Sequence, residues 1–213
     1  GKSSTMAAMI DAINTEREDH IVMIEEPIEY IHGSKRGVVN QRQVRKHTES
    51  YSNALRAALR EDPDVIAVGE LRDEETISLA MTAAETGHLV ISTLHTSNAI
   101  QTVDRLINAF PPLEQSRVRT ALSQTLRCVV CQKLIATIDG KSRVAAFEIL
   151  VNTPSVAQLI REDETLQIKS LMELGGRTGM CLFDQSLAGL VRQGLISIAE
   201  GTRHSDNPEG FTV

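Results

Sequence analysis

The first residues of the chain are of the types that bind phosphate in loops preceding a helix. Gly1-Lys2-Ser3 matches the last three positions of the motif G-x-x-x-x-G-K-[ST], and an amphipathic helical pattern follows. In that motif backbone N–H groups hold the phosphates, the lysine reaches the β- and γ-phosphates, and the hydroxyl binds Mg²⁺. A glycine, a lysine and a helix-capping serine also occur together by chance. The candidate phosphate-binding residues are Gly1, Lys2, Ser3 and Ser4, with Ser3 also a candidate metal ligand.

Two acidic segments could complete such a site. Residues 64–70 read DVIAVGE, an apolar strand between carboxylates, which is the form of a Walker B strand. Residues 25–29 read EEPIE and place three carboxylates around a rigid turn, just after another predicted strand. Carboxylates at the carboxyl edge of a sheet can orient water and hold metal. The alternatives are an ordinary core strand flanked by surface acids and an acidic surface turn.

His88 and His95 lie at the two ends of a predicted strand. Fully extended, that strand would separate them by about 23 Å, so they are poorly placed to share a metal ion. A single histidine most often makes a structural hydrogen bond. His95, at the carboxyl end, is the better functional candidate.

Strand and helix patterns alternate through the first half of the chain. We expect helices over 4–13, 51–60, 74–85 and 98–109, and strands over 20–24, 64–68 and 88–94. This order indicates an α/β fold with a doubly wound, mostly parallel sheet.

The second half is predicted to be mainly helical. We expect one long helix over 113–134, a hairpin of strands 136–138 and 144–150, and helices over 155–161, 166–174, 183–193 and near 198. Cys128 and Cys131 would lie on the long helix, where two buried small residues are the favoured interpretation. The polar stretch 205–210 is expected to fray. We place a domain boundary after residue 152, giving domains 1–152 and 153–213.

Composition excludes several classes of protein. The chain has 213 residues and 41% apolar residues, enough for a core, but its apolar runs are too short to span a membrane. Three cysteines cannot build a disulfide framework, which favours a reducing cytosol. The net charge of −6 argues against general nucleic-acid binding.

Longer stretches resemble a known family. Residues 59–73, LREDPDVIAVGELRD, closely resemble the signature of the type II secretion and type IV pilus ATPases. Residues 24–29 are similar to the acidic box of that family, and residues 86–96 to its histidine box. Residues 156–162, 175–180 and 184–187 resemble its pilus-retraction branch. The four-cysteine zinc insertion usual in the assembly and secretion branches is missing.

The resemblance implies a fold and a set of roles. The first 152 residues would be a RecA-like P-loop NTPase core without its first strand and most of its P-loop, followed by a small helical subdomain. ATP and Mg²⁺ are the implied ligands, with catalytic carboxylates Glu29 and Glu70. Nucleotide would contact Gly1, Lys2, Ser3, Ser4, His88, His95 and Arg72, and metal would contact Ser3, Glu26 and Asp64. Glu26 stands where the family usually has Asp.

The resemblance also implies partners and a place in the cell. The family forms homo-hexameric ring motors in the cytoplasm, peripheral to the inner membrane at the pilus base. They act on an inner-membrane platform protein and indirectly on pilins, without binding nucleic acid or inserting into the membrane. The candidates for contacts between subunits are Arg42, Arg56, Arg60 and Arg72.

Three other functions remain open from the sequence. They are an assembly or secretion ATPase of the same family, a RecA-like nucleic-acid translocase, and a subunit that binds without turnover. A polypeptide of residues 1–213 alone, with three P-loop motif residues, is expected to bind ATP very weakly and not to hydrolyse it.

Overall fold

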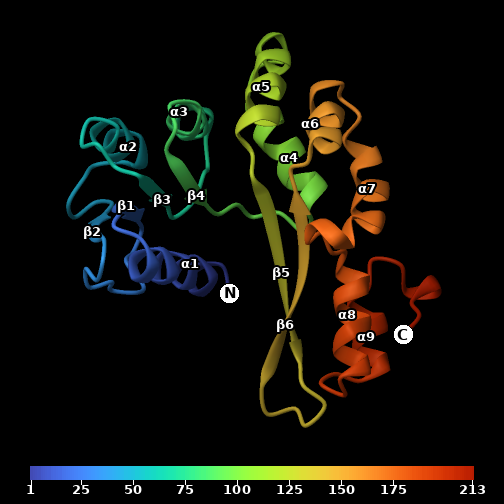
Figure 1. The fold of residues 1–213 in the computed structure, drawn as a ribbon. Coiled ribbons are helices and arrows are strands. Elements are labelled where there is room, and N and C mark those ends of the chain that lie inside the picture. Colours follow the sequence, from blue (N-terminus) through green and yellow to red (C-terminus); the bar gives the residue numbers. More distant parts are fainter. The chain divides into compact units, whose positions relative to one another are not determined.

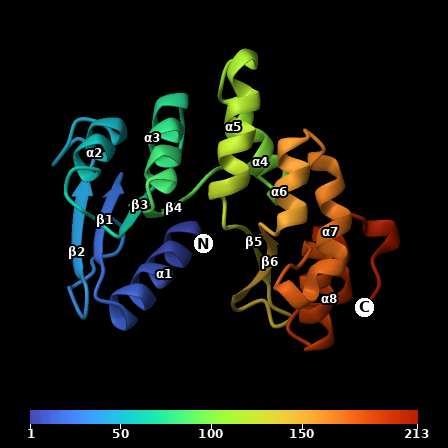
Figure 2. The same cartoon turned by 45° about the horizontal axis from the view of Figure 1, so that its top comes forward.

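The structure is a computed structural model that describes residues 1–213. The chain divides into two compact units, drawn in Figures 1 and 2. The first comprises residues 1–95 with 109–111, and the second comprises residues 96–108 and 112–213. None of the helices combines the length and the hydropathy that a membrane span requires.

The first unit contains a four-stranded parallel sheet. Its strands are β1 (His20–Glu25), β2 (Val38–Gln43), β3 (Val65–Val68) and β4 (Leu89–Ser92), in the spatial order β2-β1-β3-β4. Because all four run in one direction, their carboxyl ends meet at a single edge of the sheet. We call this the carboxyl edge, and the opposite one the amino edge.

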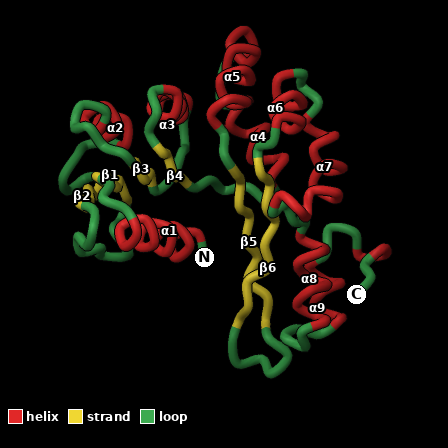
Figure 3. The backbone as a smooth tube through the Cα atoms, in the orientation of Figure 1, coloured by secondary structure: helices red, strands yellow, loops and turns green.

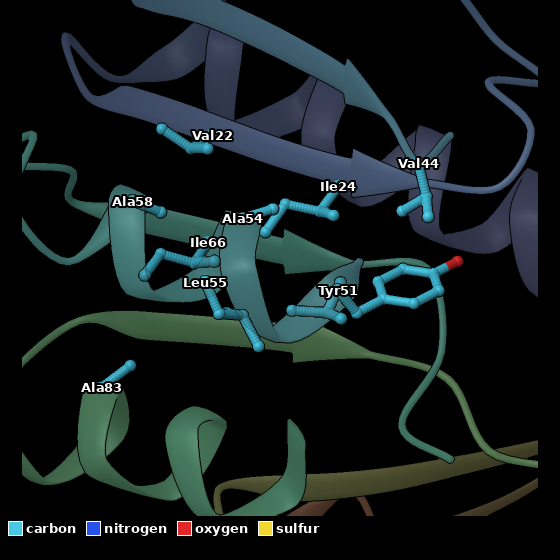
Figure 4. Packing of buried hydrophobic residues seen from close by; sticks show 10 residues of the cluster. Val22, Ile24, Val44, Tyr51, Ala54, Leu55, Ala58, Ile66 and Ala83 are labelled. Carbon is cyan, nitrogen blue, oxygen red and sulfur yellow. The ribbon is translucent and has the colours of Figure 1, made fainter. Parts of the chain in front are cut away.

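Helices cover both faces of this sheet, which confirms the doubly wound arrangement (Figure 1). Side chains alternate between faces along a strand, so Ile21 and Met23 of β1 pack against α1 (Lys2–Glu16). Val22 and Ile24 point to the other face, which is covered by α2 (Tyr51–Ala58) and α3 (Glu74–Glu85). Figure 4 shows this second cluster, with Leu55 of α2 packed over the strands.

The second unit combines a long hairpin with helices (Figure 3). Strand β5 (Cys128–Ala136) pairs antiparallel with β6 (Arg143–Val151). Helix α8 packs on β6, and α9 packs on α8 and β5. The helices are α4 (Ala99–Asn108), α5 (Pro112–Thr125), α6 (Pro154–Arg161), α7 (Ile168–Leu174), α8 (Phe183–Arg192) and α9 (Ile198–His204), with 3₁₀ turns at Thr165–Gln167, Gly175–Thr178 and Pro208–Gly210.

The single long helix expected over 113–134 is wrong. Helix α5 ends at Thr125, where the Asn152 side chain donates to the carbonyls of Ser123 and Leu126, both at 2.9 Å. This cap comes from the far end of β6, so no local pattern reveals it. The chain then continues as β5, in which three-residue spacing puts Cys128 and Cys131 on opposite faces. Cys131 is buried as expected, whereas Cys128 is exposed.

Two further differences concern β2 and the domain boundary. Strand β2, with the sequence VVNQRQ, is mostly polar because it lies at the edge of the sheet, and the sequence did not predict it. The expected boundary after residue 152 falls inside the second unit. The hairpin belongs with the carboxyl-terminal helices because α8 and α9 pack on it.

Candidate active site at the carboxyl edge of the parallel sheet

Side chains far apart in the sequence meet at the carboxyl edge. The Lys2 Nζ lies 2.9 Å from Nδ1 of His95, which follows β4. The Ser3 hydroxyl donates to Oε1 of Glu29 at 2.8 Å, and the Ser4 and Tyr30 hydroxyls are 2.8 Å apart. The structure therefore brings together the expected phosphate-binding residues, one expected catalytic carboxylate and the favoured histidine.

The start of α1 suits an anion. Gly1 is the N-cap residue, no side chain caps the helix, and its first turn contains no acid. The first N–H groups of a helix have no partner within it and carry partial positive charge. With the ammonium of Lys2 alongside, they form a site for phosphate.

Glu70 extends from the end of β3 into the same region. Its backbone neighbour Gly69 donates to the Ile24 carbonyl at 2.7 Å, and a Cβ on Gly69 would stand 3.1 Å from the Tyr51 hydroxyl. Because β1 and Tyr51 approach the backbone so closely here, position 69, just before Glu70, favours glycine. The Glu70 side chain is only 14% exposed.

Positive groups keep Glu70 ionised. Its Oε1 accepts a hydrogen bond from Arg72, and its Oε2 lies 3.6 Å from Nε2 of His95. The hydrogen bond from Arg72, together with the charges of Arg72, His95 and Lys2, holds the pKa of Glu70 below its usual value despite some burial. A charged carboxylate here can orient water or accept its proton.

A buried network, missed in the sequence, supports the loop that carries Glu29. Glu25 is 5% exposed and accepts hydrogen bonds from Gln41 at 3.0 Å and from the backbone N–H of Glu29. Gln41 also donates to the Tyr30 carbonyl at 2.8 Å and accepts from His32 N–H at 2.9 Å. Burial raises the pKa of Glu25. Gln41 lies on the unpredicted β2, so only correct strand pairing could have revealed this support.

Tyr51 is a second residue that the sequence did not single out. Figure 4 shows its ring at the strand ends, with the hydroxyl directed away from the apolar cluster. Burial, followed by the negative charges of Glu70 and Glu26, raises the pKa of Tyr51 to about 12. The hydroxyl therefore stays protonated at neutral pH and can donate a hydrogen bond at the carboxyl edge.

The three expected metal-binding residues are not gathered. Ser3 contacts Glu29, whereas the Glu26 carboxylate is 2.8 Å from Nε of Arg45, and Asp64 accepts from the backbone N–H of His20 at 2.8 Å. No cluster of three or more His, Cys, Asp or Glu side chains is placed to hold a metal ion. The Ser3 hydroxyl beside the Glu29 carboxylate still fits Mg²⁺, which favours oxygen ligands and keeps several waters.

Asp64 and His88 lie at the amino edge, away from Lys2. Asp64 precedes β3 and His88 precedes β4, and both line a cavity of about 330 Å³ with Arg17 and Asp62. His88 Nδ1 bonds the Ala83 carbonyl at 2.9 Å. The structure therefore does not bring these two residues to the expected metal and nucleotide site beside Lys2, because parallel strands place their carboxyl ends, not their amino ends, at the start of α1.

The arginines expected at subunit contacts lie on the surface of the first unit. Arg42 pairs with Glu61, Arg56 with Glu75, and Arg72 with Glu70. Arg60 is exposed. Contacts between subunits remain a prediction for all four.

Comparison with known proteins identifies relatives of this chain. The family model of Type II/IV secretion system protein matches residues 1–203. The chain is 53% identical over 212 residues to a twitching motility protein of Neisseria gonorrhoeae, covering 100% of this chain and 57% of that protein. It is 52% identical over 211 residues to the type IV pilus retraction ATPase PilT of Pseudomonas aeruginosa, covering 99% and 61%.

A solved structure of the pilus retraction motor PilT with bound ADP has a TM-score of 0.91 and 46% identity, covering 98% of this chain and 59% of that one. This likeness confirms the expected fold class. The chain spans about three fifths of the length of the relatives it matches. With a family model matching nearly its whole length, the chain belongs to the Type II/IV secretion system protein family.

Proposed function

We propose that this chain carries the catalytic core of an ATP-hydrolysing motor that retracts type IV pili. The observation that supports this most is the meeting of Lys2, Ser3, Glu29, Glu70 and His95 at the start of α1. A twitching motility protein and a pilus retraction ATPase are 53% and 52% identical over nearly the whole chain, whereas a type II secretion system protein E is 42% identical over 62% of it, which favours retraction over secretion.

In the proposed reaction, the ammonium of Lys2 leaves His95 and binds the β- and γ-phosphates at the α1 N-terminus. The Ser3 hydroxyl, with Glu29 next to it, would hold Mg²⁺, which when bound neutralises charge on the phosphate oxygens. Glu29 and the ionised Glu70 orient the attacking water and receive its proton. His95, no longer bonded to Lys2, can then form a hydrogen bond with the γ-phosphate.

The assembly and its partners belong to the same proposal. The active form would be a homo-hexamer in the cytoplasm, bound peripherally to the inner membrane. ATP hydrolysis by the hexamer would move the inner-membrane platform protein and, through it, the pilins. Arg42, Arg56, Arg60 and Arg72 would contribute contacts between subunits, since closed rings use head-to-tail interfaces.

The first test is steady-state phosphate release by the full-length protein with Mg²⁺ and ATP. Lys2→Ala should lower kcat by about 100-fold or more, because it removes the charge that binds the transferred phosphoryl group. Lys141→Ala, in the exposed hairpin turn, is the matched control. Unchanged hydrolysis by Lys2→Ala would overturn the proposal.

The second test separates retraction from assembly. In cells whose own retraction ATPase has been deleted, the full-length protein should restore pilus retraction, observed as shortening of labelled pili. Restored pilus assembly without retraction would place the chain in the assembly branch instead.

A further inference from the structure

We propose that Glu148 is a positioning residue that passes a change at Lys2 and His95 to helix α8. One buried carboxylate binds the first turns of two helices, and one of those helices follows the nucleotide site directly along the chain. The inference rests on the proposed function, because it concerns what nucleotide binding moves.

Glu148 lies on β6 and is 5% exposed. Its Oε1 accepts from the backbone N–H of Ala99 at 2.7 Å, and the carboxylate also accepts from the backbone N–H of Phe183. Ala99 is the first residue of α4 and Phe183 the first residue of α8. The first N–H groups of a helix lack partners within it, so one side chain serves both helix starts.

A simple packing role does not explain a carboxylate at this place. Burial raises the pKa of Glu148 by penalising its charged form. An apolar side chain would avoid that cost, but it would leave the N–H groups of Ala99 and Phe183 without an acceptor. A carboxylate has two acceptor oxygens and no donor, so it can accept from both helix starts at once.

The α4 side of this link begins in the active site. His95 contacts Lys2 and Glu70, and only residues 96–98 separate it from α4. These residues are bound to the first turn of that helix: the Thr96 and Thr102 hydroxyls are 2.7 Å apart, and Asn98 accepts from the N–H of Gln101 at 2.8 Å. When Lys2 leaves His95 to bind phosphate, a shift of His95 would therefore reach the start of α4.

The α8 side ends at the carboxyl-terminal segment. The Lys133 ammonium lies 4.1 Å from the centre of the Phe183 ring and 3.0 Å from Oδ1 of Asp206. The N–H of Asp206 in turn donates to Asp184 in the first turn of α8, at 2.9 Å. The start of α8 is thus in contact with β5 and with the carboxyl-terminal tail. A displacement of Glu148 would therefore shift the start of α8 and change these contacts.

Hydrogen–deuterium exchange of the full-length protein, with and without a non-hydrolysable ATP analogue and Mg²⁺, tests the link. In the unmodified protein we expect the analogue to change exchange in the first turn of α1 and, with it, in residues 99–102 and 183–187. A response in α1 without one in α8 would overturn the inference alone. No response even in α1 would overturn the proposed function, and the inference with it.

Glu148→Gln should uncouple the two responses. The amide keeps one acceptor oxygen and replaces the other with an NH₂ group, a donor that cannot accept from a backbone N–H. The hydrogen bond to one of the two helix starts is therefore weakened or lost. We expect the analogue to alter α1 exchange as before, while the response of residues 183–187 falls about tenfold or more, equal to about 1.4 kcal/mol of coupling. A merely structural role would instead speed exchange at 183–187 equally with and without the analogue.

Glu173→Gln makes the same chemical change on the exposed surface of α7 and is the control. It should leave both responses intact. If Glu148→Gln does not fold, the exchange pattern of the unmodified protein still decides the question, because the link requires α4 and α8 to respond together.

Discussion

The two edges of the parallel sheet contain similar residues, but those residues make different contacts. At the carboxyl edge the polar side chains bond one another, as in the pairs Lys2–His95 and Ser3–Glu29. At the amino edge Asp64 accepts from a backbone N–H and His88 bonds a backbone carbonyl. A side chain that is hydrogen-bonded to a loop backbone helps to hold that loop and is not free to bind a ligand. Two side chains that are hydrogen-bonded to each other can exchange that bond for one to a ligand.

The direction of the strands explains this difference. In a parallel sheet with covering helices, the helix N-termini gather at the carboxyl edge and the C-termini at the amino edge. The start of α1 therefore brings partial positive charge to Lys2, while the end of α3 lies close to His88. The helix ends therefore favour an anionic ligand at the carboxyl edge and disfavour one at the amino edge, although both edges contain arginine and histidine.

The largest effect is expected when matched carboxylates at the two edges are changed. Glu29→Gln should lower kcat by about 10² to 10⁴-fold, because it removes a base near the attacking water. Asp64→Asn should leave kcat unchanged, since its remaining oxygen can still accept from His20 N–H. Steady-state ATP hydrolysis by the full-length variants measures both, and equal losses would remove the functional distinction between the edges.

Much of this geometry could be predicted from the sequence. The apolar strand before Glu70 and the acidic turn carrying Glu29 placed both carboxylates at strand ends, and the structure brings both to α1. The sequence does not show which of the two acids flanking β3, Asp64 or Glu70, lies near Lys2, because their local patterns are similar. Only the direction of the strand relative to α1 distinguishes them.

The missed elements depend on contacts that are remote in sequence. Strand β2 is polar and is defined by parallel pairing with β1, so the network of Gln41 and Glu25 could not be foreseen. Asn152 sets the end of α5 from beyond the hairpin. The polar composition of 205–210 predicts fraying, yet Asp206 forms an ion pair with Lys133 and its backbone N–H donates to Asp184.

Replacing the histidines at the two edges should change kcat less than replacing the carboxylates does. His95→Ala should lower kcat by about tenfold, equal to about 1.4 kcal/mol, because the group next to Lys2 and Glu70 is lost. His88→Ala should leave kcat unchanged and lower the free energy of unfolding by about 1 kcal/mol, the value of its hydrogen bond to Ala83. Hydrolysis assays and urea denaturation distinguish these outcomes, and a reversed pattern would place the reacting phosphate at the amino edge.

Removing Arg72 should change the pH dependence of hydrolysis. The hydrogen bond and charge of Arg72 lower the pKa of Glu70, and the ionised form is the one proposed to act. In Arg72→Gln the pKa of Glu70 should rise, so a smaller fraction is ionised at acidic pH and the acidic limb of kcat moves to higher pH. Arg42→Gln, which removes an ion pair with Glu61 elsewhere on the unit, should leave that limb in place. An identical limb in both variants would exclude Glu70 as the titrating group.

The smallest effect is expected on the pH dependence of the free energy of unfolding, and it comes from Glu25, the buried residue that supports the Glu29 loop. Burial raises the pKa of Glu25 above its ordinary value of 4.5, so the folded protein retains a proton that the unfolded chain releases. The free energy of unfolding should therefore fall relative to Glu25→Gln as pH rises above 4.5, until Glu25 ionises in the folded state as well. Denaturation of both proteins at pH 4 and pH 7 measures this difference. A free energy of unfolding that instead rises relative to Glu25→Gln between pH 4 and pH 7 would mean that the hydrogen bonds from Gln41 and Glu29 stabilise the charge more than burial opposes it. The carboxyl edge could then hold a buried anion without bound phosphate.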